Sequence, residues 1–335
     1  MPVKAAINGF GRIGRNVLRA IVGSDRRDIV VAAINDLGPV ETNAHLLHFD
    51  SIHGRFPHQV TVMGNTMDVG RGLIKVTSAK DPATLPQAAL DIDVALECSG
   101  IFNTRDKAAA HLKAGAKRVI VSAPDEGADL TVVYEVNHQN LSNEHLVISN
   151  ASPSTNCLAP VANVLNDAVG IDRGFMTTIH SYTGNQPALD TLHEDPYRAR
   201  AAAMSMIPTS TGTARAVGLV LPDRNGRLDG TAIRVPTPNV SVVDFKFIAN
   251  RATSVAEVNA SIKDAAKGGL KDILDYTDEP NVSVDFNHDC RSSIFHTDQT
   301  KVIDGTFVRV MSRYDNEWGF SSRMSDTAVV MGRLL

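Results

Sequence analysis

The strongest constraint on how this chain folds is a glycine-rich turn near its start. Residues 3–8 form a short apolar run typical of a strand, residues 9–14 read GFGRIG, and the residues that follow carry apolar side chains at helical spacing. Gly9 permits the tight turn, Gly11 lets the backbone approach a pyrophosphate, and Gly14 lets helix and strand pack closely. The order of strand, glycine turn and helix predicts a dinucleotide-binding unit.

An acidic residue follows the second strand of this unit. Residues 29–34 form an apolar run that leads to Asn35 and Asp36, about 20 residues beyond the last glycine, where such units carry a ribose-binding acid. The Asp36 carboxylate would accept hydrogen bonds from a ribose 2′-hydroxyl and repel a 2′-phosphate, which favours NAD over NADP. The alternative, a carboxylate that only caps a loop, is weaker because strand, glycines, helix and acid occur in order.

Later segments extend this pattern. Strand-like runs at residues 92–97 and 118–122 each lead into small residues, and residues 104–114 read as a helix. Small residues at the carboxyl ends of strands suit a crevice that receives a flat cofactor. Strands that alternate with helices predict a parallel sheet with helices on both faces.

Length and composition narrow the class of protein. The chain has 335 residues, which favours two domains, and its net charge of −4 and pI of about 6.3 suggest neither a nucleic-acid nor a membrane partner. No apolar run approaches the roughly 20 residues that span a bilayer, and the strand at residue 3 leaves no room for a signal peptide. Three cysteines without metal-ligand spacing favour a reducing, cytoplasmic setting and no metal site.

A further helix is predicted from Pro153 onward. Ser152 is a good N-cap, and Leu158, Val161 and Leu165 lie on one stripe. Proline is tolerated at the first helical position because its φ suits the helix and its missing N–H would be unpaired there anyway. A side chain at this position lies at the positive end of the helix dipole, where a thiolate would be stabilised.

The helix start belongs to a longer motif. Residues 149–160 read SNASPSTNCLAP, which closely resembles the active-site segment of phosphorylating glyceraldehyde-3-phosphate dehydrogenases. Similar motifs follow in family order, namely FMTTIHSYT at 175–183, TSTG at 209–212, IRVPTP at 233–238 and RYDNEWGFS at 313–321. The resemblance covers essentially the whole chain. Erythrose-4-phosphate dehydrogenases share most of these motifs, but the TSTG segment looks like the glyceraldehyde-3-phosphate type.

The resemblance implies an α/β fold with three parts. These are a Rossmann-type doubly wound NAD-binding domain at 1–151, an α+β catalytic domain with a mostly antiparallel sheet at 152–316, and a C-terminal helix at 317–335 that packs back on the first domain. It implies the glycolytic oxidation of glyceraldehyde-3-phosphate with NAD and inorganic phosphate to 1,3-bisphosphoglycerate. It also implies a homotetramer, in which the long irregular stretch between His180 and Pro208 packs at subunit interfaces.

The resemblance also assigns site residues. His180 matches the general base. The cofactor residues would be Gly9, Gly11, Arg12, Ile13, Asp36, Ser99, Gly100, Ser122 and Asn316, the last holding the nicotinamide carboxamide. One phosphate site would comprise Ser152, Ser154, Arg198, Thr211 and Gly212. Arg200 could share the phosphate binding assigned to Arg198. A second phosphate site would comprise Thr183 and Arg234, because hydroxyl and guanidinium groups suit a phosphate.

Two positions depart from the family pattern. Pro153 occupies the place of the catalytic cysteine, and Arg313 occupies that of a common tryptophan. Proline has neither a nucleophilic side chain nor the backbone N–H that helps stabilise the oxyanion. Loss of a nucleophile costs on the order of 10⁴ to 10⁶ in rate, and loss of one oxyanion donor on the order of 10² to 10³. The neighbours Cys157, Ser152 and Ser154 are poor substitutes, since the first reads as a buried structural thiol and the hydroxyls are unactivated.

Three hypotheses therefore remain open. The chain is a dehydrogenase of this family that binds NAD and phosphate ligands but turns over very slowly. Alternatively, it is an NAD-binding pseudoenzyme or regulatory paralogue. In the third hypothesis it oxidises a hydrated aldehyde without covalent catalysis, with His180 as the base.

Overall fold

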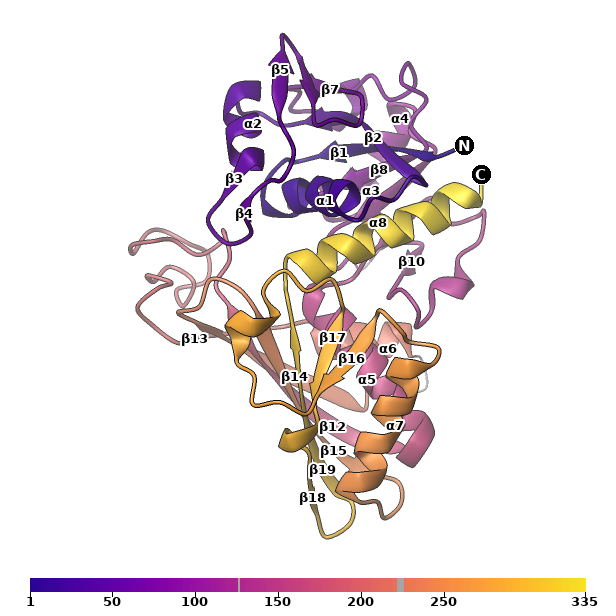
Figure 1. Ribbon diagram of the computed structural model, residues 1–335, viewed down its shortest axis with the longest axis vertical. Helices are drawn as coiled ribbons and strands as arrows, with labels where there is room; N and C mark the ends of the chain where they lie inside the picture. Colours follow the sequence, from indigo (N-terminus) through magenta and orange to yellow (C-terminus); the bar gives the residue numbers. More distant parts are fainter. Residues whose placement is uncertain (126, 222–225) are drawn as a thin grey trace. The chain divides into compact units, whose positions relative to one another are not determined.

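The computed structural model describes residues 1–125, 127–221 and 226–335, which divide into two compact units. The first unit comprises residues 1–134, 138–151 and 321–335, and the second comprises residues 135–137 and 152–320, within the described ranges. Figure 1 shows the helices and strands of both units.

A nine-stranded sheet forms the centre of the first unit, in the order β10-β11-β9-β8-β1-β2-β7-β6-β5. The strands are β1 (Val3–Asn8), β2 (Ile29–Asn35), β5 (Thr61–Met63), β6 (Thr66–Asp68), β7 (Leu73–Thr77), β8 (Val94–Glu97), β9 (Arg118–Val121), β10 (Leu130–Thr131) and β11 (Val147–Ser149). All neighbours from β10 to β7 pair in parallel, and β5 and β6 add an antiparallel edge. From β1 the chain adds β2 and β7 on one side of β1, and then β8 on the opposite side of β1. The strand order therefore reverses between β1 and β8. Crevices at such reversals are the usual ligand sites of open α/β sheets.

The helices of the first unit connect these strands. They are α1 (Arg12–Gly23), α2 (Val40–His48), α3 (Arg105–Ala108), α4 (Ala110–Lys113) and most of α8 (Trp318–Arg333), and a small pair of strands, β3 (Phe49–Asp50) and β4 (Gly54–Arg55), follows α2. The helix expected at 104–114 is two short helices instead, because Ala109 both ends α3 and caps α4. The C-terminal helix begins at Trp318, close to its expected start.

The second unit is built on a mostly antiparallel sheet in the order β13-β14-β12-β15-β19-β17-β16, with β18 beside β19. Its strands are β12 (Ile171–Ser181), β13 (Ile207–Thr209), β14 (Leu228–Val235), β15 (Ser241–Ala249), β16 (Leu274–Thr277), β17 (Ser293–His296), β18 (Lys301–Ile303) and β19 (Phe307–Tyr314). Only β12 with β14 and β16 with β17 are parallel among the described pairs. Helices α5 (Pro153–Val169), α6 (Thr213–Val220) and α7 (Val255–Lys267) lie together on one face of this sheet (Figure 1). The expected fold class is therefore confirmed in both units.

Two structural facts bear on the class of protein. Among the described residues, no helix combines the length and the apolar character needed to cross a membrane. In the same part of the chain, no group of three or more His, Cys, Asp or Glu side chains could hold a metal ion.

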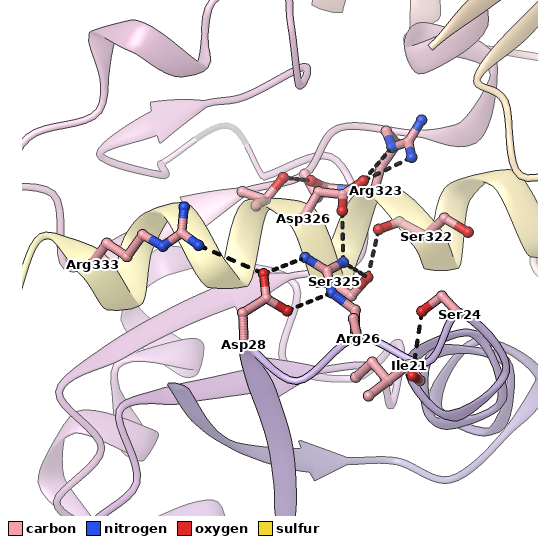
Figure 2. Close-up of polar contacts among 11 residues, drawn as sticks. Ile21, Ser24, Arg26, Asp28, Ser322, Arg323, Ser325, Asp326 and Arg333 are labelled. Carbon is pink, nitrogen blue, oxygen red and sulfur yellow. Dashed lines mark hydrogen bonds and ion pairs between the residues drawn. The ribbon is translucent and has the colours of Figure 1, made fainter. Parts of the chain in front are cut away.

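A polar network ties α8 to the loop between α1 and β2 (Figure 2). Arg26 donates to both carboxylate oxygens of Asp28, at 2.8 and 3.0 Å, and its Nη1 donates to Asp326 at 2.7 Å and to Ser325 at 3.0 Å. Arg333 lies 3.7 Å from the same Asp28. Because Arg26 bridges two segments almost 300 residues apart in sequence, it fixes the C-terminal helix to the first unit.

We predict that Arg26→Ala lowers the free energy of unfolding by about 1–3 kcal/mol, since it leaves partly buried carboxylates without their shared donor. In this variant Asp326 still accepts a hydrogen bond from Arg323, which limits the loss of stability. Urea denaturation measures the change. The matched control is Arg27→Ala, an exposed neighbour without a hydrogen-bond or ion-pair partner among the described residues, which should change stability by less than about 0.5 kcal/mol. Equal effects of the two variants would contradict the role of the network.

Candidate functional site

The glycine turn after β1 has the geometry that its sequence predicts. Gly9 has φ +87°, and a Cβ atom there would lie 2.5 Å from the backbone of Ser99. A Cβ atom at Gly14 would lie 2.1 Å from the carbonyl oxygen of Gly9, whereas nothing lies within 4 Å of one at Gly11. Gly9 and Gly14 therefore allow close packing, and the open space at Gly11 suits the approach of a ligand.

The same turn begins a helix. Gly11 is the N-cap of α1 and offers no side-chain cap. Ile13 lies half-buried in the first turn, where helix N–H groups and the helix dipole favour an anion. Residues of this turn are suited to hold the pyrophosphate of a dinucleotide.

Asp36 lies just beyond the carboxyl end of β2 and organises the local backbone. Its carboxylate oxygens accept hydrogen bonds from the N–H groups of Phe10 and Gly38, both at 2.9 Å. A cavity of about 680 Å³ is lined by the residues that follow Asp36, beginning with Leu37, and by Thr77. The Asp36 carboxylate thus holds the glycine turn, and the residues after it line a cavity large enough for a nucleoside.

Arg12 makes a contact that its sequence did not predict. Its guanidinium donates to both carboxylate oxygens of Asp50. Burial raises the pKa of Asp50, but hydrogen bonds from Arg12 and from the backbone N–H groups of His53 and Ile52 outweigh burial and lower it to about 2. The Arg12 side chain is therefore held by an ionised partner at the start of α1.

The other predicted cofactor residues of this unit lie after β8 and β9. Ser99 and Gly100 form the turn after β8, with Gly100 exposed at φ +74°. Ser122 follows β9 and donates its N–H to the carbonyl of Glu97 at 2.9 Å. Ser99 donates to the carboxylate of Glu97, which is buried. Sequence reasoning missed Glu97. An acidic residue at the end of an apolar strand was the one available signal.

In the second unit, the N-terminus of α5 forms as its sequence predicts. Ser152 is the N-cap and its Oγ accepts a hydrogen bond from the N–H of Thr155 at 3.1 Å. Pro153 is the first helical residue, where its missing N–H costs little. The helix is therefore intact although the position carries no reactive side chain.

Hydroxyl groups connect Ser152 to the segment that begins α6. The hydroxyl of Thr213 lies 3.4 Å from that of Ser152 and 2.8 Å from that of Thr211, and Gly212 is the N-cap of α6. Arg198 donates twice to the hydroxyl of Thr209 at the end of β13, at 2.8 and 2.6 Å. Ser152, Thr211 and Gly212 thus lie close together, and Arg198 contacts the strand that leads to them.

His180 and Arg234 are partners in the parallel pairing of β12 and β14. The Nη1 of Arg234 lies 2.6 Å from His180 Nδ1 and 2.9 Å from the carbonyl of Ser181. Burial, followed by the charge of Arg234, lowers the pKa of the His180 imidazole to about 3. The ring is therefore neutral at physiological pH, and it lies beside a cation that has no carboxylate partner among the described residues.

Thr183 and Ser154 make hydrogen bonds to residues other than those with which the resemblance groups them. No hydrogen bond joins Thr183 to Arg234 in the described part of the chain; its carbonyl accepts from the N–H of Gln186. The buried Ser154 hydroxyl lies 2.5 Å from the hydroxyl of Tyr314. Burial raises the pKa of Tyr314 to about 12, so this neighbour is neutral.

Asn316 follows β19 and is almost fully buried. Its Oδ1 accepts from the hydroxyl of Ser241 at 2.7 Å, and that hydroxyl accepts from the N–H of Ser181 at 3.0 Å. Asn316 is thereby connected through hydrogen bonds to the residue beside His180. This orientation leaves the Asn316 amide nitrogen without a hydrogen-bond partner among the described residues, as a donor for a ligand would require.

Three further residues named from sequence are placed by the structure. Cys157 is fully buried, with its Sγ 3.4 Å from the Ser293 hydroxyl, and burial raises its pKa to about 12. Arg200 forms an exposed ion pair with Asp190 at 2.7 Å. Arg313 is half-buried on β19, where burial lowers its pKa, and its Nε has no hydrogen-bond partner among the described residues. Nothing in the structure explains this arginine.

Comparisons with known proteins agree with the two-unit architecture. Residues 3–105 match the family model of the glyceraldehyde 3-phosphate dehydrogenase NAD binding domain, and residues 152–316 match that of the C-terminal domain. The chain is 73% identical over 334 residues to glyceraldehyde-3-phosphate dehydrogenase of Xanthobacter flavus and 69% identical over 335 residues to that of Cereibacter sphaeroides, in each case over 100% of both chains. A plasmid form from Cupriavidus necator is 56% identical over 99% of both chains. The chain therefore belongs to the glyceraldehyde-3-phosphate dehydrogenase family of NAD-dependent oxidoreductases.

Proposed function

We propose that this protein binds NAD, glyceraldehyde-3-phosphate and inorganic phosphate, but oxidises the aldehyde only very slowly. The observation that carries the proposal is Pro153 at the first position of α5, the place of the family's nucleophilic cysteine. The helix around it, the neighbouring hydroxyls and the glycine turn of the first unit all keep geometries suited to binding.

The residues of the first unit support NAD as the ligand. The close approach at Gly9, the open space at Gly11 and the carboxylate of Asp36 each fit one part of a dinucleotide. Ser99, Gly100 and Ser122 follow β8 and β9, and Arg12 and Ile13 begin α1; we assign them to the same site. When bound, NAD supplies the hydride acceptor of the family reaction.

The cations of the second unit support phosphate as the other ligand. Arg234 is surrounded by a neutral imidazole and a carbonyl, and no carboxylate pairs with it among the described residues. Arg198 contacts a hydroxyl more closely than it does Asp195, which lies 3.6 Å away. Guanidinium groups that make no short hydrogen bond to a carboxylate are suited to bind phosphate in charge-assisted pairs. We assign Arg198, Ser152, Thr211 and Gly212 to one anion, and Arg234 with Thr183 to the other.

The missing step is nucleophilic attack. In the family reaction a thiolate attacks the aldehyde carbon, a hydride leaves for NAD, and inorganic phosphate displaces the thiol from the resulting thioester. Cys157 cannot take over this step because its thiol is buried and its pKa is raised to about 12. The Ser154 hydroxyl contacts Tyr314, which is no base at neutral pH. The structure thus offers no activated substitute among the described residues.

His180 also argues against oxidation of a hydrated aldehyde without a covalent intermediate. A general base works best with a pKa near the working pH, whereas burial and Arg234 lower that of His180 to about 3. A phosphate bound at Arg234 would offset part of this charge. The second candidate function is therefore a protein that binds these ligands without oxidising the aldehyde. It differs from the first only in its rate of aldehyde oxidation.

We predict that Pro153→Cys raises the rate of NAD reduction on the order of 10⁴-fold or more, because it restores both the nucleophile and a backbone N–H. NADH absorbance in the presence of glyceraldehyde-3-phosphate and inorganic phosphate measures the rate. The matched control is Pro153→Ala, which restores the N–H without a thiol and should gain less than about 10³-fold. An inert Pro153→Cys protein that still binds NAD would contradict an otherwise intact catalytic site.

Cofactor choice gives a second prediction. Asp36→Asn keeps a carbonyl oxygen for the backbone N–H groups of Phe10 or Gly38 but removes the charge that would repel a 2′-phosphate. We expect the preference for NAD over NADP to fall about tenfold or more, since like charges in close contact cost several kcal/mol. Calorimetric titration with both nucleotides measures it. Glu41→Gln, which removes a charge elsewhere on the same cavity, should change the preference far less; equal changes would argue against Asp36.

We also propose that the chain forms a homotetramer in the cytoplasm. Four large apolar side chains of the irregular 182–206 stretch are three-quarters or more exposed, namely Leu189, Leu192, Met204 and Met206. Exposed apolar clusters of this kind usually mark protein–protein contacts. We expect sedimentation velocity to find tetramers, and Leu192→Asp to shift them to smaller species. Leu73→Asp, at an exposed site of the first unit, should leave the tetramer unchanged, and a monomeric unchanged chain would overturn the proposal.

A further inference from the structure

The Glu97 carboxylate is fully buried at the end of β8 and has two partners on each oxygen. Oε1 accepts from the N–H of Ser99 at 2.7 Å and from its hydroxyl at 2.5 Å. Oε2 accepts from Asn8 Nδ2 at 2.5 Å and lies 3.0 Å from Nε2 of His111, which is also fully buried. The imidazole in turn contacts Gln87 through Nδ1 at 2.8 Å.

Hydrogen bonds extend from this carboxylate across the sheet. Asn8 Oδ1 accepts from Asn35 Nδ2 at 2.8 Å. Asn35 Oδ1 accepts from the Thr77 hydroxyl at 2.9 Å and from the N–H of Ala79 at 2.8 Å. One side-chain network therefore spans the carboxyl ends of β8, β1, β2 and β7, four neighbouring positions in the sheet.

These strand ends carry the residues assigned to the cofactor. Asn8 precedes Gly9, Asn35 precedes Asp36, and Ser99 itself follows β8. Gly9 and Ser99 are also in such close contact that a single added Cβ would lie 2.5 Å from the Ser99 backbone. A shift of the Ser99 turn must therefore displace the glycine turn as well.

Stability alone does not account for a buried charge at this place. Burial of a carboxylate is costly unless it is paired and hydrogen-bonded, and an apolar replacement of a whole buried ion pair is often as stable. A carboxylate with four donors is, however, an effective way to hold separate backbone segments in one geometry. We propose that Glu97, held by His111, is a positioning residue that keeps the Gly9 and Ser99 turns in the geometry that binds NAD. This inference rests on the proposed NAD-binding residues.

The test replaces the charge without changing the shape. In Glu97→Gln, an amide N–H₂ faces at least one of the present donors, so the two turns lose a shared acceptor. We expect the dissociation constant for NAD, measured by calorimetry, to rise about tenfold or more, which equals about 1.4 kcal/mol. Binding of inorganic phosphate, assigned to residues of the second unit, should stay unchanged. In the Pro153→Cys background, KM for NAD should rise while kcat changes little.

Two further variants separate positioning from simple loss of stability. Arg26→Ala destabilises the same unit without touching these turns and should keep its NAD affinity. His111→Gln keeps a donor for Glu97 and should bind NAD nearly normally, whereas His111→Leu lacks the donor and should weaken binding as Glu97→Gln does. If Glu97→Gln does not fold, the comparison of His111→Gln with His111→Leu tests the proposal by itself.

The outcomes are distinct. NAD binding by Glu97→Gln or His111→Leu as tight as that of the unchanged chain overturns the positioning role alone. A loss of affinity in Arg26→Ala equal to that in Glu97→Gln also overturns it, because stability would then explain both. Failure of the unchanged chain to bind NAD overturns the proposed function and, with it, the role of this pair.

Discussion

The first unit depends on the buried carboxylate of Glu97. Its hydrogen bonds connect the ends of neighbouring strands beyond the pairing that the sheet itself provides. Parallel pairing aligns β8, β1, β2 and β7, and the first residue after a strand still donates its N–H to the neighbouring strand, as Gly9 does to the Asn35 carbonyl at 2.9 Å. Glu97, Asn8 and Asn35 add side-chain hydrogen bonds to this backbone pairing. The turn at Gly9, which has φ +87°, passes so close to that of Ser99 that a Cβ atom would not fit.

In the second unit, the candidate site residues lie at the N-termini of α5 and α6 and near the ends of β12 and β14. The N-termini of α5 and α6 bring hydroxyl groups together through Ser152, Thr211 and Thr213. The parallel pairing of β12 with β14 sets His180 beside Arg234. None of these contacts requires a thiol at position 153, which is why a proline there leaves the helix intact. These contacts are therefore independent of the residue at position 153.

Sequence reasoning anticipated the parts of the site that depend on local structure. The glycine turn, the cap at Ser152 and the place of Asp36 follow from short-range rules, and the geometry agrees with each. It was less successful where side chains choose among distant partners. Ser154 contacts Tyr314, 160 residues away in sequence, and Arg12 contacts Asp50. Neither choice has a signal in spacing or composition, because both depend on how elements far apart in sequence pack.

The amino-acid sequence by itself determined the fold class, the family motifs, the glycine turn and the absence of a cysteine at position 153, since these depend on periodicity, turn chemistry and residue identity. Only the tertiary structure decided which polar groups are buried together. The Glu97 and His111 pair, the neutral His180 beside Arg234 and the inert Cys157 all follow from burial. Burial removes water as a partner, so the hydrogen bonds and charges of these groups are set by neighbours that only the folded chain brings close.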